Sequence, residues 1–282
     1  MHSERARRLS ALKRLAKEGK WDQLYQRHVF YEFPHELETG FQLAFLRSFA
    51  DPDMAKILQR SGSLAADPML RAYRTRTFIE EIIHGAITDE RAAAFVRRMN
   101  RIHGAFPITQ EQLTYILCAF IVVPTRHVEH TGWRPVTAEE REAATRFYER
   151  LGRHMDIQRR PRSYQQAAQI IDDYERAHLA PSPAGIELTR ALVAAIAERL
   201  PRPIRPLVPA LFAQDLRSPL VAHALGLENA PHRHIATVLT KVRVTIDRVR
   251  TRHTRPSDLP NFEPGQPIPG YFPAGYTVKD FA

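Results

Sequence analysis

Residues 67–85 read DPMLRAYRTRTFIEEIIHG, and both ends of this stretch carry helix-boundary signals. Asp67 is a residue type that caps helix N-termini, Pro68 suits the first helical position, and Gly85 suits the position just past the end. Together they frame a predicted helix of about five turns. One face of this helix combines polar and apolar side chains at helical spacing: Arg71, Thr75, Phe78 and Ile82.

The same kind of signal recurs along the rest of the chain. Three pairs match the capping box, in which a Ser or Thr and a Glu or Gln three residues later cap a helix start reciprocally: Thr109 with Gln112, Thr137 with Glu140, and Ser163 with Gln166. Further helices are predicted over residues 41–49, 183–200 and 231–252. No stretch shows the alternation of polar and apolar residues that strands between hairpin turns would show. The sequence therefore predicts an all-α fold.

The composition suggests three parts in the 282-residue chain. A helical lead-in is expected over residues 1–35, a single large helical domain over 36–255, and an irregular Pro-rich C-terminal tail over 256–282. Six prolines prevent a regular helix in the tail. The tail also contains aromatic residues, which we expect to pack back onto the helical body: Phe262, Tyr271, Phe272, Tyr276 and Phe281.

The overall balance of residues is that of a soluble globular protein, with 44% hydrophobic and 26% charged residues. The single cysteine, Cys118, rules out an intramolecular disulfide and lies in an apolar run, where we expect an inert core residue. That run, residues 113–124, is about half as long as the ~20 residues of a membrane-spanning helix. No apolar segment of the secretory type follows the basic N-terminus. We therefore expect a cytoplasmic protein without a membrane span.

The formal net charge of +10 allows two interpretations. One is a partner rich in phosphate, such as nucleic acid or a membrane surface. The other is a solvated, arginine-rich surface. The densest basic block, residues 241–255, overlaps apolar residues at helical spacing, so we expect the apolar side chains to face the core and the charges to face solvent: Ile235, Val238, Leu239, Val242, Ile246 and Val249. This pattern favours the solvated surface.

Two polar placements stand out as candidates for chemistry. His103 closes an apolar helical stripe that begins at Ala92, although a lone core histidine is more often a structural residue than a ligand. Arg71 lies on the inward face of the helix over 68–84, where a guanidinium requires an anion. That anion could be an acidic side chain or the carboxylate of a bound cofactor. Arg74 and Arg76 lie on the flanking faces, and we expect at least Arg76 to be solvated.

Other possible sites have weaker patterns. His127 and His130 are three residues apart, so one helix turn could offer two nitrogen ligands to a metal. Their spacing is not that of the zinc proteases, and histidine near a helix C-terminus is favourable on dipole grounds alone. His232 and His234 fall on different helix faces. The sequence contains no Gly-rich phosphate loop, Gly-x-Ser-x-Gly elbow or Cys-x-x-Cys-His motif, so hydrolase and nucleotide-dependent activities have no support.

A set of short motifs, in order and at compatible spacing over roughly residues 40–180, resembles the MpaB-type oxygenases and, more distantly, the rubber oxygenases (latex-clearing proteins). The motifs are FQLAFLRSFADP (41–52), Asp67-Pro68 with Arg71 and Thr75, Ile102-His103, FPITQE (106–111), GWRP (132–135) with Glu140, LGRHMDI (151–157), PRSY (161–164), and Tyr174-Glu175.

This resemblance implies an all-helical protein that binds haem b non-covalently. His103 stands where the family places the proximal iron ligand, and Arg71 and Thr75 stand at the pair that supports the haem pocket. Arg74 stands where rubber oxygenases carry a distal lysine, and arginine does not readily become a neutral ligand. The implied activity is a haem-dependent oxidoreductase in which O2 oxidises a double bond of an apolar or prenylated small molecule, with Arg71, Arg74 and Thr75 as catalytic residues.

Two hypotheses of other classes remain beside this one. The first is a non-catalytic helical binding or interaction protein that keeps the fold, which the arginine at position 74 favours. The second is nucleic-acid binding through the basic surface, although no specific nucleic-acid partner is expected. The oligomeric state is not predicted.

Overall fold

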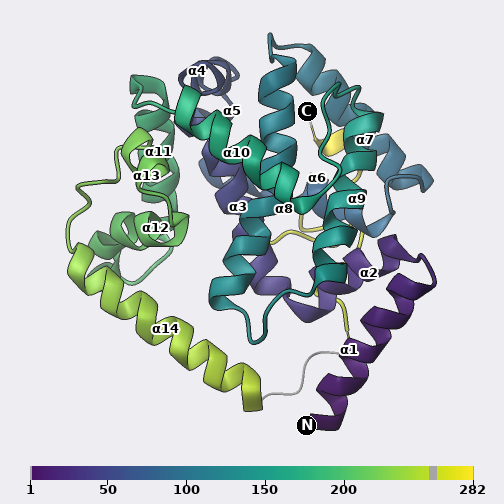
Figure 1. Cartoon of the computed structure of the whole chain (residues 1–282). Coiled ribbons are helices and arrows are strands. Elements are labelled where there is room, and N and C mark those ends of the chain that lie inside the picture. Colours follow the sequence, from purple (N-terminus) through teal and green to yellow (C-terminus); the bar gives the residue numbers. More distant parts are fainter. Residues whose placement is uncertain (1, 254–258, 282) are drawn as a thin grey trace.

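Two long helices, α3 (Pro34–Ala50) and α8 (Gln110–Thr131), pack against each other at the centre of the molecule (Figure 1). The computed structural model describes residues 2–253 and 259–281. Gly40 allows the two backbones to approach closely, because a Cβ at this position would overlap the Cα of Pro124. The apolar run of α8 is buried, as predicted, at Leu117, Cys118, Ala119, Ile121, Val122 and Val123.

Further helices surround this central pair. One group consists of α1 (His2–Lys17), α2 (Trp21–Arg27), the π-helical turn η1 (His28–Glu32), α9 (Ala138–His154) and α10 (Tyr164–His178). In this group α9 and α10 pack on α8, α1 and α2 pack on α9, and η1 packs on α2 and α3. A second group lies toward α3 and consists of α4 (Pro52–Arg60), α5 (Ser63–Ala66), α6 (Pro68–His84), α7 (Glu90–Gly104) and α11 (Pro183–Glu198).

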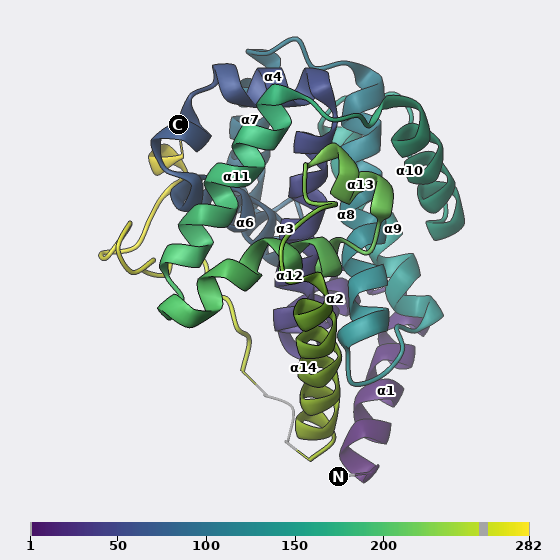
Figure 2. The ribbon, with the colours of Figure 1, turned by 90° about the vertical axis from the view of Figure 1, so that its left-hand side faces the viewer.

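The last part of the chain adds four short elements and the long helix α14 on the outside (Figure 2). They are the 3-10 turn η2 (Arg202–Leu207), α12 (Val208–Leu216), α13 (Pro219–Ala224), α14 (Arg233–His253) and the 3-10 turn η3 (Val278–Asp280). In the described ranges, one isolated antiparallel bridge between Ile268 and Phe272 is the only extended pairing. The prediction of an all-α fold is confirmed. None of the described helices combines the length and apolar composition that crossing a bilayer requires.

Helix α6 begins and ends where the sequence of residues 67–85 predicts. The carboxylate of Asp67 accepts hydrogen bonds from the backbone N–H groups of Met69 and Leu70 at 3.0 and 2.9 Å. Gly85 follows directly after the last helical residue. The Asp-Pro start and glycine stop therefore set the ends of α6 as the sequence predicts.

The three predicted capping boxes differ in outcome. Thr109 and Thr137 start α8 and α9 with fully reciprocal boxes. At α10 the hydroxyl of Ser163 accepts the backbone N–H of Gln166, but the Gln166 side-chain oxygen accepts from the backbone N–H of Arg162 instead. Ser163 is thus an N-cap without the second half of the box.

A buried ion-pair cluster ties η1 to the segment that leads into α9. The carboxylate of Glu140 pairs with His28 at 2.9 Å and with Arg134 at 2.7 Å, and Arg134 also reaches Glu32 at 3.3 Å. Burial alone would raise the pKa of Glu140, but the neighbouring His28 and Arg134 hold it well below its usual range. The GWRP motif with its distant glutamate is therefore a structural clamp in this fold.

A second cluster ties α3 to α8 and α10. Arg47 and Glu175 form a buried ion pair at 2.8 Å, and the Tyr115 hydroxyl donates to the same carboxylate at 3.2 Å. Next to it, the Tyr174 hydroxyl donates to Asp51 at 2.5 Å. Several motifs of the sequence set thus act by holding helices together.

The orientation predicted for the helix over residues 231–252 is wrong. Helix α14 begins at Arg233, and its buried residues are the small Ala236 and Thr240. The larger aliphatic residues expected in the core are exposed instead: Ile235, Val238, Leu239, Val242 and Ile246. An amphipathic pattern shows that a helix has an apolar face, but it does not show that the rest of the same chain covers that face. The side chain of Val249 lies outside the described residues.

The C-terminal tail returns to the helical body. The rings of Phe262, Tyr276 and Phe281 are buried, and Phe281 packs edge-to-face on Phe78 of α6 and Phe95 of α7. The backbone N–H of Asn261 donates to the carbonyl of Phe30 at 3.3 Å. Aromatic burial thus fixes a segment that has almost no regular secondary structure of its own.

Candidate functional site

Helix α6 holds Arg71 and Thr75 as a connected pair. The guanidinium of Arg71 donates to the Thr75 hydroxyl, which lies one helix turn further along and itself donates to the backbone carbonyl of Arg71 at 3.1 Å. The Arg71 cation also lies 5.2 Å from the centre of the Phe45 ring on α3. These contacts restrict the guanidinium to one orientation at the junction of α3 and α6.

No carboxylate of the described residues balances the charge of Arg71. Among the described residues, none forms an ion pair with it, although the side chain is half-buried. Burial, with the nearby charge of Arg74, lowers the pKa of Arg71 to about 10, so the group stays protonated at neutral pH. Of the two anions that the sequence allowed for Arg71, the acidic side chain is not found in this part of the structure.

His103 lies in the last turn of α7, partly buried as the apolar stripe predicts. Its Nδ1 atom is buried and has no hydrogen-bond partner among residues 2–253 and 259–281, which costs roughly 1–3 kcal/mol if no ligand compensates. Burial, and to a lesser extent the charge of Arg71, lower the pKa of His103 to about 4. The imidazole is therefore neutral at neutral pH, with a nitrogen lone pair available to a metal. The charge of Arg71 is thus close enough to His103 to disfavour protonation of the imidazole.

Arg74 is held by the C-terminal tail. Its guanidinium donates to the backbone carbonyl of Asp280 at 3.2 Å, and its Nε atom is buried without a hydrogen-bond partner. Nearby, Arg98 of α7 donates to the carbonyl of Phe281 at 2.5 Å. Arg74 thus lies between α6 and the tail, one residue before Thr75 but on a different face of the helix.

The expectation that Arg76 would be solvated is wrong. Arg76 is half-buried and pairs with Glu80 at 2.9 Å and with Glu38. Glu80 is buried, and this burial, with Glu38 and Glu81 nearby, raises its pKa to about 7 although Arg76 acts in the opposite direction. The sequence analysis assigned no role to Glu80, although its spacing of four residues from Arg76 on a helix predicts an ion pair.

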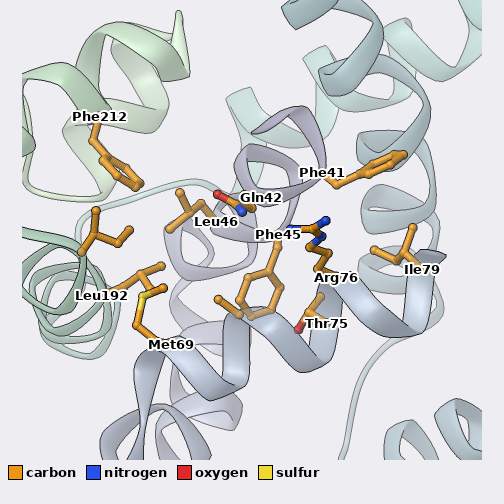
Figure 3. Close-up of a pocket in the computed structure, with 12 residues that line it drawn as sticks. Phe41, Gln42, Phe45, Leu46, Met69, Thr75, Arg76, Ile79, Leu192 and Phe212 are labelled. Atoms are coloured by element: carbon orange, nitrogen blue, oxygen red, sulfur yellow. The ribbon is translucent and has the colours of Figure 1, made fainter. Parts of the chain in front are cut away.

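A small cavity of about 40 Å³ lies between α3, α6, α11 and α12 (Figure 3). It has room for a few water molecules. Thr75 lines it, and Phe45 connects it to the Arg71 cation that lies over its ring. His103 is not part of its wall. The full lining is Phe41, Gln42, Phe45, Leu46, Met69, Ala72, Thr75, Arg76, Ile79, Leu192, Ile196 and Phe212.

The competing sequence candidates are not brought together. On α8, His127 is buried whereas His130 is exposed, so the two imidazoles do not face one site. His232 and His234 are both exposed at the start of α14. A search of the described residues finds no cluster of three or more His, Cys, Asp or Glu side chains that could hold a metal ion. Cys118 is buried, and burial raises its pKa to about 12, which agrees with an inert thiol.

Comparison with known proteins gives a family and distant relatives. Residues 37–254 match the family described as ER-bound oxygenase mpaB/B′/Rubber oxygenase, catalytic domain. The "ER-bound oxygenase mpaB'" of Penicillium brevicompactum is 25% identical over 194 residues, which is 62% of this chain and 46% of the relative. The "ER-bound oxygenase mpaB" of the same organism is 28% identical over 132 residues, 45% of this chain and 34% of the relative.

A further relative, the "ER-bound oxygenase mpaB" of Penicillium roqueforti (strain FM164), is 27% identical over 132 residues, 45% of this chain and 44% of that protein. The chain covers less than half of the length of each of these relatives. The family match, in contrast, extends over most of the chain and includes α6, α7 and the residues of the candidate site. The protein therefore belongs to the family of ER-bound oxygenase mpaB/B′ and rubber oxygenase catalytic domains.

Proposed function

We propose that this protein is a haem b-dependent oxygenase that uses O2 to oxidise a double bond of an apolar or prenylated small molecule. Membership of an oxygenase family supports the reaction class. The single observation that carries the cofactor assignment is the neutral, partly buried imidazole of His103, whose Nδ1 atom has no partner in the described structure, beside the Arg71 cation.

The residues of this region fit the chemistry of haem. A histidine that holds haem iron must be a neutral imidazole, and the low pKa of His103 keeps it neutral well below pH 7. The propionates of haem are carboxylates, and Arg71 is a half-buried cation for which no described residue supplies one. His103 would hold the iron, Arg71 would bind a propionate, and the Thr75 hydroxyl would keep the guanidinium oriented.

The chain's own groups divide the work as follows. Bound haem supplies an iron that binds and activates O2. Arg71 and Thr75 supply hydrogen-bond donors beside a region whose wall is mostly apolar, with Phe41, Phe45 and Leu46 among its lining residues. Arg74, anchored to the Asp280 carbonyl, is proposed to add positive charge near Arg71 rather than to act as a neutral ligand.

Space is the main structural requirement of this proposal. The cavity of about 40 Å³ is far smaller than the roughly 300–1,000 Å³ of ordinary ligand sites. Haem binding therefore requires α6 and its neighbours to move apart. An apolar substrate suits the walls of this region, which are mostly aromatic and aliphatic.

The proposed reaction is tested with isotopically labelled O2. Haem-loaded protein is incubated with a prenyl alcohol such as farnesol, and the products are analysed by mass spectrometry. We expect labelled oxygen in a shortened or oxidised product with the wild type and none with His103→Ala. Substitution of the exposed His154 by alanine is the matched control and should leave the product unchanged. Haem-loaded protein that never incorporates oxygen into any unsaturated isoprenoid would contradict the proposed activity.

A non-catalytic binding protein is the second candidate. The observation that favours it is Arg74, which stands at the position of the distal lysine of rubber oxygenases and is held by the tail. This candidate predicts that the substrate panel binds without O2 consumption, and that Arg74→Ala changes stability but no reaction rate.

A further inference from the structure

Helix α14 exposes its larger aliphatic side chains to solvent, whereas a helix that only packs on the core would bury them. Its contacts with the body run through small residues, with Ala236 packed beside Ala210 and Ala230. The larger aliphatic side chains point away from this attachment and form a stripe at helical spacing, with exposed fractions of 41 to 60%: Ile235, Val238, Leu239, Val242 and Ile246. We call these five residues the α14 stripe.

The stripe lies where a large partner can reach it. Figure 1 shows α14 along the lower-left edge of the molecule, and in Figure 2 it faces the viewer with no other helix drawn in front of it. Its main contacts are with α12, α8 and η2. The five side chains of the α14 stripe are therefore open to solvent.

The charge of the same helix indicates the chemistry of the partner. The sequence of α14 contains six Lys or Arg residues and one Asp, which gives a formal charge of +5. Arg233 and Lys241 are exposed within the described part. An apolar stripe on a strongly basic helix is the pattern of helices that lie in the plane of an anionic membrane surface, with aliphatic residues between the lipid chains and cations at the headgroups.

We infer that α14 docks this protein on the surface of membranes that contain anionic lipids. A second copy of the chain fits less well, because two helices of charge +5 would repel each other. Five half-exposed aliphatic side chains also fall short of the ~800 Å² per partner of a stable protein interface. Nucleic acid would use the cations but would leave the stripe in water. The inference does not depend on haem binding or on oxygenase activity.

The test is flotation of the full-length protein with vesicles of phosphatidylcholine, with or without phosphatidylglycerol. We expect the wild type to bind the anionic vesicles at least tenfold more strongly than the neutral ones, and less strongly at high salt. The triple variant Val238→Ser, Val242→Ser, Ile246→Ser keeps the charge and should lose at least tenfold in binding. Leu259→Ser removes an aliphatic side chain that is 75% exposed outside the stripe, and should bind as the wild type does.

A third variant and three further measurements make the result decisive. Lys241→Glu changes charge without touching the stripe and should weaken binding to anionic vesicles only. Far-UV circular dichroism verifies that each variant is folded. Equal binding by the triple variant and the wild type would overturn the inference. A wild type that sediments as a dimer, with a triple variant that sediments as a monomer, would also overturn it. So would a wild type that binds duplex DNA through Lys241 but does not bind vesicles.

Discussion

Arg71 combines two properties that are costly without a ligand: partial burial and the absence of a paired carboxylate among the described residues. Its hydrogen bond to Thr75 fixes its direction but does not neutralise its charge. A bound carboxylate would do so. After the iron ligand itself, Arg71 is therefore the residue whose substitution we expect to weaken haem binding most.

Replacement of Arg71 tests this expectation. Arg71→Ala should weaken haem binding by tenfold or more, since a charge-assisted hydrogen bond contributes about 1.5–3 kcal/mol. Arg71→Lys keeps the charge and should retain most of the affinity. Titration of haem-free protein with haem, followed by absorbance, measures both. Arg101 is exposed on α7, and Arg101→Ala is the control that should bind as the wild type does. Equal affinities for all four proteins would remove Arg71 from the site.

Glu80 is expected to make the stability of the fold depend on pH, and this effect can be measured independently of haem binding. Its pKa is raised to about 7 in the folded protein, against the ordinary value of 4.5. The folded state therefore binds a proton more readily, and the stability that Glu80 contributes is present below pH 4.5 and lost as the pH rises toward 7. Relative to Glu80→Gln, the wild type should lose up to about 3 kcal/mol over this range.

The measurement is urea unfolding of both proteins at about pH 5 and about pH 7.5, on either side of most of this titration. Glu111 is an exposed carboxyl on α8, and Glu111→Gln should keep the pH dependence of the wild type. An unchanged pH dependence in Glu80→Gln would show that Glu80 ionises normally in the fold.

Local sequence signals predicted the elements well because the groups involved are neighbours in the chain. Asp67 caps α6 through backbone N–H groups only two and three residues away, and Thr109 and Thr137 act in the same way. The orientation of α14 is different. Its apolar stripe is evident in the sequence, but whether protein or another partner covers the stripe depends on how the remaining helices pack.

The close contact of α3 with α8 depends on the absence of a side chain at Gly40. Gly40→Ala would place a Cβ on the backbone of Pro124, which cannot move without shifting α8. We expect a loss of about 1–3 kcal/mol or more, as for overpacked cores. Gly104→Ala is the matched control, because a Cβ at this helical residue meets nothing within 4 Å, and alanine favours helix. Thermal unfolding of both variants measures the difference. A Gly40→Ala protein as stable as Gly104→Ala would contradict the close packing.

The whole molecule depends on contacts that sequence patterns do not reveal. The hydrogen bond from Arg74 to Asp280 joins residues 206 positions apart, and no local signal relates them. The sequence did predict that an aromatic tail returns to the body, because a segment rich in Phe and Tyr avoids water. It could not predict that the tail would meet α6 and α7, the two helices that carry Arg71 and His103. That choice of partners is a property of tertiary packing alone.

The tail can be tested through Phe281, which is fully buried between α6 and α7. Phe281→Ala should cost about 3–5 kcal/mol, as for other buried aromatic residues. The variant should also release the tail, which chymotrypsin cleavage would report. Leu259→Ala in the same segment removes a mostly exposed side chain and should change neither property. Resistance of the Phe281→Ala tail to cleavage would show that the ring does not anchor it.

The central claim is that His103 holds the iron of a haem, and the absorption spectrum of the purified protein tests it most directly. We predict a Soret band with stoichiometric iron for the wild type, and loss of both in His103→Ala. His127→Ala, which removes the buried histidine of the competing pair on α8, should keep the band. A wild-type protein that shows no Soret band even after incubation with haem, or a His103→Ala protein with unchanged iron content, would contradict the account.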